Sequence, residues 1–177
     1  MFLRNDRQPV LEVPMALRIL EALQDWDGIE PRLSFSAVHA MVKFASVGQY
    51  EDAKLLMRIF EDRLEGPLFL SAVLAVHAFA GNVEKVEALL PHLAQPLQPV
   101  HANCLLLAIW QRDHKLHDRK LVLRNMQNVY ESMRGQIAPS YQTFHLLLQA
   151  CTDDETALEW IFNSMKQYRS IISSYII

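Results

Sequence analysis

This chain of 177 residues has few cysteines and glycines and lacks long apolar runs, and these features argue against a disulfide framework and a membrane span. The two cysteines, Cys104 and Cys151, each lie inside an apolar stretch with helical spacing, which predicts buried thiols in a reducing compartment rather than a disulfide framework. No run of 18 or more apolar residues is present, so no membrane span is expected.

An excess of positive charge is also missing. The chain carries 17 Lys and Arg against 20 Asp and Glu, a net charge of −3, whereas domains dedicated to nucleic acid are usually basic. Residues 1–100 hold 9 basic against 13 acidic side chains (−4), and residues 101–177 hold 8 against 7 (+1). Any contact with phosphate is therefore expected in the C-terminal half.

The five glycines each stand where an apolar periodicity stops, and most of the eight prolines stand beside such stops. Glycine suits the residue after a helix and proline forbids its continuation, so these positions separate helices. No stretch alternates with period two for long enough to form a strand, which predicts an all-α chain with one domain. The expected helices are 15–26, 34–46, 50–64, 68–79, 83–94, 100–112, 118–134, 141–151 and 154–168, with caps at Asn82 and at Thr152 paired with Glu155.

These helices pair into hairpins at about 34–64, 68–94, 100–134 and 141–168, following a lone helix at 15–26. The prolines that close successive units are separated by 36, 32 and 40 residues, a spacing typical of helical repeat arrays. The prediction is an α-solenoid of about four stacked hairpins over residues 15–168, between an N-terminal extension (1–14) and an apolar C-terminal tail (169–177). The first 13 residues make a poor transit peptide.

Three segments resemble the pentatricopeptide repeat family. TFHLLLQAC (143–151) is similar to its first helix, ALEWIFNSMK (157–166) to its second helix, and IAPS (137–140) to its linker. ANCLLLAIW (102–110) matches less closely, and the first two units are degenerate enough that tetratricopeptide repeats remain the alternative there.

The resemblance implies a right-handed α-solenoid that, in many members, binds single-stranded RNA at one base per repeat inside an organelle, here the mitochondrion. It also implies that bases would be read by Asn103, His145 and the linker residue Ser140. Histidine departs from the family's usual small polar residue, and in the first two units only Ser36 and Ser71 correspond. With so few base-reading residues, the isolated chain is expected to bind RNA weakly or not at all.

A basic stretch within 112–124 provides candidate phosphate contacts, the alternative being a solvated loop and helix start. These candidates are Arg112, Lys115, Arg119, Lys120 and Arg124. His114 and His117 have the spacing of a metal-binding pair but lack a third ligand, so no metal and no cofactor is predicted. No nucleophile arrangement, phosphate loop or carboxylate pair is recognisable, so neither an enzyme nor a small-molecule substrate is predicted.

The aromatic residues fall on helical spacing and are expected in the core between hairpins: Trp26, Trp110, Trp160, Phe60, Phe69, Phe144 and Phe162. The apolar tail is expected to be covered by a partner, because a solenoid end otherwise needs a polar cap. These patterns predict an adaptor among the protein subunits of an organellar ribonucleoprotein such as the mitochondrial ribosome, contacting RNA through its C-terminal half. The alternatives are a sequence-specific RNA binder in organellar RNA processing or translation, and a purely protein-binding subunit of another complex.

Overall fold

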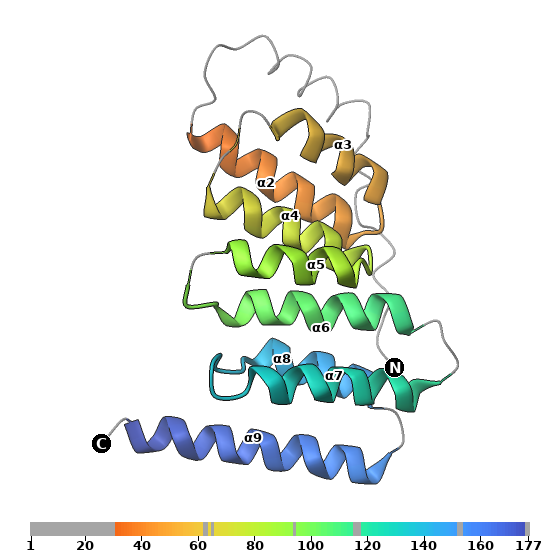
Figure 1. Ribbon diagram of the computed structural model, residues 1–177, viewed down its shortest axis with the longest axis vertical. Coiled ribbons are helices and arrows are strands. Elements are labelled where there is room, and N and C mark those ends of the chain that lie inside the picture. The colour runs from red at the N-terminus through yellow and green to blue at the C-terminus, as the bar shows by residue number, and fades with distance from the viewer. Residues whose placement is uncertain are drawn as a thin grey trace, which may run out of the picture.

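The computed structural model describes residues 31–61, 64, 66–93, 95–114, 118–151 and 154–175 (Figure 1). The helix predicted at 15–26, with Trp26, lies outside these residues. The described part contains helices and no strand, so the all-α prediction is confirmed. Its helices are α2 (Pro31–Ser46), α3 (Tyr50–Phe60), α4 (Pro67–Phe79), α5 (Val83–Leu89), the short 3-10 helix η1 (Leu90–His92), α6 (Pro99–Asp113), α7 (Arg119–Met133), α8 (Tyr141–Ala150) and α9 (Glu155–Tyr175).

Two helices differ from the predicted bounds. The predicted helix 83–94 changes to a 3-10 turn after Leu89, because Pro91 has no N–H to continue the α-helical ladder. α9 continues past residue 168 to Tyr175, so the backbone of most of the predicted tail is helical.

The helix starts use different caps from those predicted. Asn82 precedes α5 but makes no capping bond, and its Nδ2 lies 3.3 Å from Nδ1 of His77 instead. Thr152 lies outside the described residues, and Asp154 Oδ1 accepts the 3.1 Å bond from the N–H of Ala157 at the start of α9. At α7 the side chain of Asp118 accepts from the N–H of Leu121 at 3.0 Å.

The helices form a stack along the long axis of the molecule, from α2 and α3 at one end to α9 at the other (Figure 1). α2, α4, α6 and α8 form one row, in which each helix contacts the next. α3, α5, α7 and α9 each contact the row helix that precedes them, and α3, α5 and α7 also contact the row helix that follows. Each row helix between the ends of the stack is therefore covered from several sides.

α4 illustrates that a row helix covered from several sides carries apolar residues on more than one face. Ala72 and Val76, one turn apart, belong to a core shared with α2 and α3, whereas Leu74 and Ala78 belong to a core shared with the helices that follow. A helix that is apolar on all sides is suited to burial between two neighbours.

The predicted aromatic core is confirmed in part. Tyr130 packs edge-on against Trp160 with ring centroids 5.5 Å apart and lies 6.1 Å from the ring of Phe144, which joins α7, α8 and α9. Phe60 is buried, but Phe162 is 52% exposed, so its assignment to the core was wrong. Both cysteines are buried, and burial raises the pKa of the Cys104 thiol to about 12.

Candidate functional site

Two of the predicted base-reading residues lie side by side where α6 meets the start of α8. Asn103 Nδ2 donates a 3.0 Å hydrogen bond to Oγ of Ser140, and Oγ1 of Thr143 donates one of 2.7 Å to Oδ1 of Asn103. The side chains of Ser140 and Thr143 also form the capping box of α8, because each accepts from the backbone N–H of the other.

The two hydrogen-bonded residues Asn103 and Thr143 are also buried, each being 5% exposed. Both ends of the Asn103 amide are therefore bonded within the protein. Base reading by Asn103 and Ser140 stays a prediction, and it would require this amide to leave its two partners. The role that the structure shows for them is the attachment of α8 to α6.

The same relationship occurs one unit earlier, between α4 and α6. Oγ of Ser71 lies 3.3 Å from Nε2 of His101, and Nδ1 of His101 accepts from the backbone N–H of Gln98, the N-cap of α6. In both cases the fifth residue of one row helix bonds to the third residue of the next, and that third residue belongs to a capping box.

His101 is neutral in this arrangement. Its Nδ1 accepts a backbone N–H and so carries no proton, which leaves the proton on Nε2 to be donated to Ser71. Burial lowers the pKa of His101, because the charged imidazolium would be poorly solvated there. Sequence reasoning missed this residue, although a histidine in the third position after a Gln-Pro helix start is a visible signal.

His145, the third base-reading candidate, is the fifth residue of α8 and has no row helix after it in the described chain. It is exposed, its ring is stacked on Tyr141 with centroids 6.1 Å apart, and its Nε2 lies 3.2 Å from Nε2 of Gln149. The His145 side chain therefore lies at the surface, unlike that of Asn103, and its polar contact is with the exposed Gln149 on its own helix.

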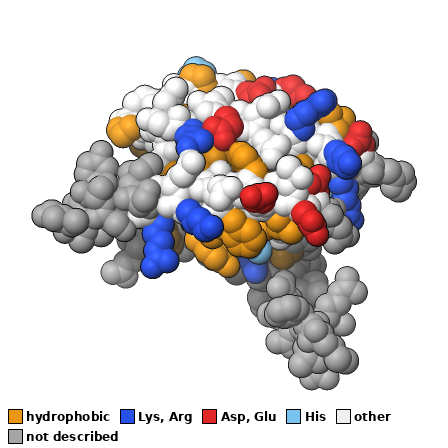
Figure 2. All heavy atoms as spheres, turned by 90° about the horizontal axis from the view of Figure 1, so that it is seen from below, with side chains coloured by type: hydrophobic (Ala, Val, Ile, Leu, Met, Phe, Trp, Pro, Cys, Tyr) orange, Lys and Arg blue, Asp and Glu red, His pale blue; other side chains and the backbone are white. Residues whose placement is uncertain are grey.

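The end of the stack formed by α8 and α9 exposes apolar groups. Tyr141 is 84% exposed and Phe162 52%, and Leu148, Leu158 and Met165 are partly buried. Figure 2 views this end and shows apolar side chains gathered in one region, with Lys, Arg, Asp and Glu side chains around them. We call the two exposed aromatics, His145 and the three partly buried residues the end surface.

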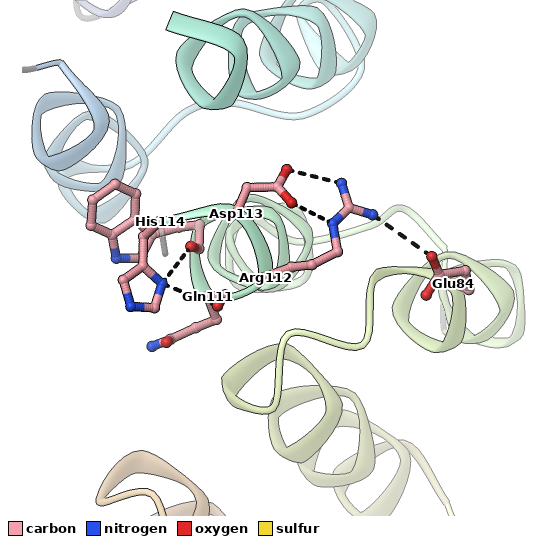
Figure 3. A network of polar contacts seen from close by, with 6 residues as sticks. Glu84, Gln111, Arg112, Asp113 and His114 are labelled. Carbon is pink, nitrogen blue, oxygen red and sulfur yellow. Dashed lines mark hydrogen bonds and ion pairs between the residues drawn. The ribbon is translucent and has the colours of Figure 1, made fainter. Parts of the chain in front are cut away.

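Arg112, a predicted phosphate contact, is bound within the protein. Its Nε and Nη2 donate to the two carboxylate oxygens of Asp113 at 2.7 and 3.0 Å, and its Nη1 lies 3.7 Å from Oε1 of Glu84 on α5 (Figure 3). The guanidinium holds the pKa of the buried Asp113 carboxyl below its usual range. Arg112 thus links α5 to α6 in this structure, and its contact with phosphate stays a prediction.

The other phosphate candidates lie differently. Arg119, Lys120 and Arg124 are exposed on α7 and form no ion pair with another residue of the described chain, whereas Lys115 lies outside the described residues. Arg119 and Lys120 occupy the first turn of α7, where the helix dipole does not favour positive charge. These three side chains therefore remain candidates for contact with phosphate.

His114, from the predicted histidine pair, faces its own helix end. Its Nδ1 lies 2.9 Å from the carbonyl of Trp110 and 3.0 Å from that of Gln111, and its ring stacks on Trp110 (Figure 3). His117 lies outside the described residues. Among the residues whose placement is described, no group of three His, Cys, Asp or Glu side chains could hold a metal ion.

A hollow of about 320 Å³ lies between the end of α7 and α9, and the sequence did not indicate it. Arg134 crosses this region to bond the side chain of Gln167. The lining residues are Arg134, Thr156, Glu159, Trp160, Asn163, Ser164 and Gln167. Its polar groups come from several turns of α9, so no single local pattern in the sequence could have predicted it.

No family model matches this chain, and neither a curated protein nor a solved structure matches it. Over the described residues, no helix is both long enough and apolar enough to cross a membrane.

Proposed function

We propose that this chain is a short pentatricopeptide-like α-solenoid that acts as a non-enzymatic adaptor in an organellar, mitochondrial ribonucleoprotein. The observation that carries the proposal is the end surface, where Tyr141 and Phe162 are exposed on helices that also contribute buried residues to the core. Exposed apolar groups gathered on one surface mark sites of protein interaction. The row contacts α2–α4, α4–α6 and α6–α8 support the solenoid, because the same helix pairing recurs along the chain.

The position of the free cations supports contact with RNA as a secondary role. Arg119, Lys120 and Arg124 are exposed in the less acidic half of the chain and can meet phosphates without breaking an ion pair to another described residue. The mitochondrial and ribonucleoprotein parts of the proposal rest on the resemblance of 137–166 to the repeat family.

Sequence-specific RNA reading is the second candidate, and the convergence of Asn103 and Ser140 favours it. The adaptor is preferred because those two side chains bond to each other and to Thr143. Only His145 of the three readers is exposed, and one reader cannot specify a sequence.

The test is affinity purification of the tagged chain from mitochondria, with proteins identified by mass spectrometry and RNA sequenced from the same eluate. Leu148→Asp is expected to remove the main protein partner, and the triple variant R119A/K120A/R124A to reduce RNA at least tenfold while retaining that protein. The pair K43A/K85A, on exposed lysines of α2 and α5, is the charge control.

Three outcomes would contradict parts of the proposal. Recovery of no protein would overturn the adaptor. Protein without RNA from every variant would favour the purely protein-binding subunit, and loss of a single preferred RNA sequence on His145→Ala would favour the sequence reader.

A further inference from the structure

α4, α6 and α8 carry the same pattern of residues on one face, and on α8 no further helix of the described chain packs on that face. The fifth residue of each helix is polar and the eighth is leucine: Ser71 and Leu74, Asn103 and Leu106, His145 and Leu148. Residues three apart lie on one face of a helix, so each pair marks the same face of its helix.

In the first two helices this face is occupied. Leu74 and Leu106 are 0% and 1% exposed, and the polar residues above them bond to the next row helix, Ser71 to His101 and Asn103 to Thr143. The face that carries the pair is thus the one that receives the following helix.

On α8 the same face is unoccupied in the described chain. His145 is exposed, with its Nε2 3.2 Å from Nε2 of Gln149 on the same helix, and Leu148 is only partly buried. Tyr141, one turn before His145 and stacked on it, adds apolar area at the position where the N-terminus of a next helix would lie.

We infer that this face receives an amphipathic α-helix of a partner protein, docked as the next helix of the row. This inference rests on the proposed adaptor function and specifies the partner. By continuity with the α4–α6 and α6–α8 contacts, the partner helix begins beside His145 and carries a capping box. The polar side chain at its third position bonds to His145, and aliphatic side chains in its next turns pack on Leu148.

A second copy of this chain fits the face poorly. Within the described residues, α4, α6 and α8 are each covered by the row helix that precedes them, so α2 is the row helix that another copy could add to the row. The third residue of α2 is Leu33, which has no polar group to meet His145. The occupant is therefore a helix with Ser, Thr, Asn, Asp, Gln or Glu at that position.

Photocrosslinking in mitochondria tests where the partner lies. Tyr141→p-benzoylphenylalanine places the probe on a residue that is 84% exposed, and Phe35→p-benzoylphenylalanine, 61% exposed on α2 at the other end of the stack, is the matched control. The probe at 141 is expected to crosslink within the first two turns of a helix of one other protein, and the probe at 35 is not.

A synthetic peptide of the crosslinked helix then tests the contacts, with binding to the full chain measured by fluorescence anisotropy. His145→Ala and Leu148→Asp are each expected to weaken binding tenfold or more, whereas Asn128→Ala, exposed on α7, leaves it unchanged. Alanine at the third position of the peptide should weaken binding as much as His145→Ala, with little further loss when both changes are combined, because the pair acts as one contact.

Crosslinks at 141 to RNA, to an extended segment or to another copy of this chain would overturn the inference, as would a peptide indifferent to His145→Ala and Leu148→Asp. If position 141 gives no crosslink while the tagged chain still recovers a specific protein complex, the inference fails and the adaptor proposal stands. If no protein is recovered at all, the adaptor proposal itself fails.

Discussion

The hydroxyl of Thr143 donates a 2.7 Å hydrogen bond to the side-chain carbonyl of Asn103, 40 residues earlier in the chain. This bond joins the helix cap of one unit to the interior of the unit before it. Local helix capping and the attachment of neighbouring units therefore depend on the same side chains.

Asn103→Ala should destabilise the fold because it removes both bonds of the amide and leaves the buried hydroxyl of Thr143 and the partly buried hydroxyl of Ser140 with one partner fewer. We expect the free energy of unfolding, measured by urea denaturation, to fall by about 1–3 kcal/mol. The control is Asn128→Ala, an exposed helical asparagine, which should change it by less than about 0.5 kcal/mol. Equal effects of the two variants would show that the Asn103 bonds do not hold α8 in place.

Gly81→Ala should be more costly than Gly48→Ala, although both glycines have positive φ (+73° and +85°). A Cβ at Gly81 would lie 2.9 Å from the backbone nitrogen of Arg112, whereas a Cβ at Gly48 would have no atom within 4 Å. Backbone strain alone costs about 1–2 kcal/mol, and the clash should add about 1–3 kcal/mol at Gly81. Thermal unfolding of the two variants measures the difference, and equal melting temperatures would show that the turn before α5 does not press on α6.

Arg112→Ala should destabilise the chain at neutral pH by about 1–3 kcal/mol, because the buried Asp113 would lose its two-bond partner. The exposed Arg119→Ala is the matched control and should cost less than about 0.5 kcal/mol.

The same pair gives a pH signature. Because the pKa of Asp113 is lowered in the folded state, the pair stabilises the fold above the ordinary aspartate pKa of 3.8, and this contribution disappears as the pH falls through the folded-state value. The stability difference between wild type and Arg112→Ala should therefore shrink in acid. A difference that stays constant from pH 7 to pH 3 would argue against the ion pair as its cause.

Stability should also fall on mild acidification through His101. Its pKa is lowered by burial, so below about 6.5 the unfolded chain binds a proton that the folded chain takes up only at lower pH. Urea unfolding at several values between pH 8 and pH 5.5 should show this loss, and His101→Gln should reduce its slope. A His101→Gln slope equal to wild type would place the effect elsewhere, for example at His77, whose pKa burial also lowers.

The helices themselves were predictable because their signals are local. The glycine and proline stops around α4 and α6 and the apolar spacing of α8 place those helices within one residue of their observed bounds. The end of α9 was not predictable in this way, because 169–175 combine apolar residues and serines without a helix stop, and continued helix and separate tail were equally compatible with them.

The roles of the candidate site residues, in contrast, were not predictable from local signals. The sequence pointed to Asn103, Ser140 and His145 as base readers, but of the three only His145 is exposed. Arg112 and Arg119 likewise look equivalent in the basic stretch, yet one is bound to Asp113 and the other is free of ion pairs within the described chain.

The sequence by itself determined that this protein is a series of helices whose apolar faces need neighbours, since periodicity and helix stops depend on residues only a few positions apart. The tertiary structure alone decided which polar side chains are used to join one unit to the next and which are left exposed. That choice depends on whether another helix covers a given face, and the helices concerned come from residues about 30 to 40 positions away in the chain.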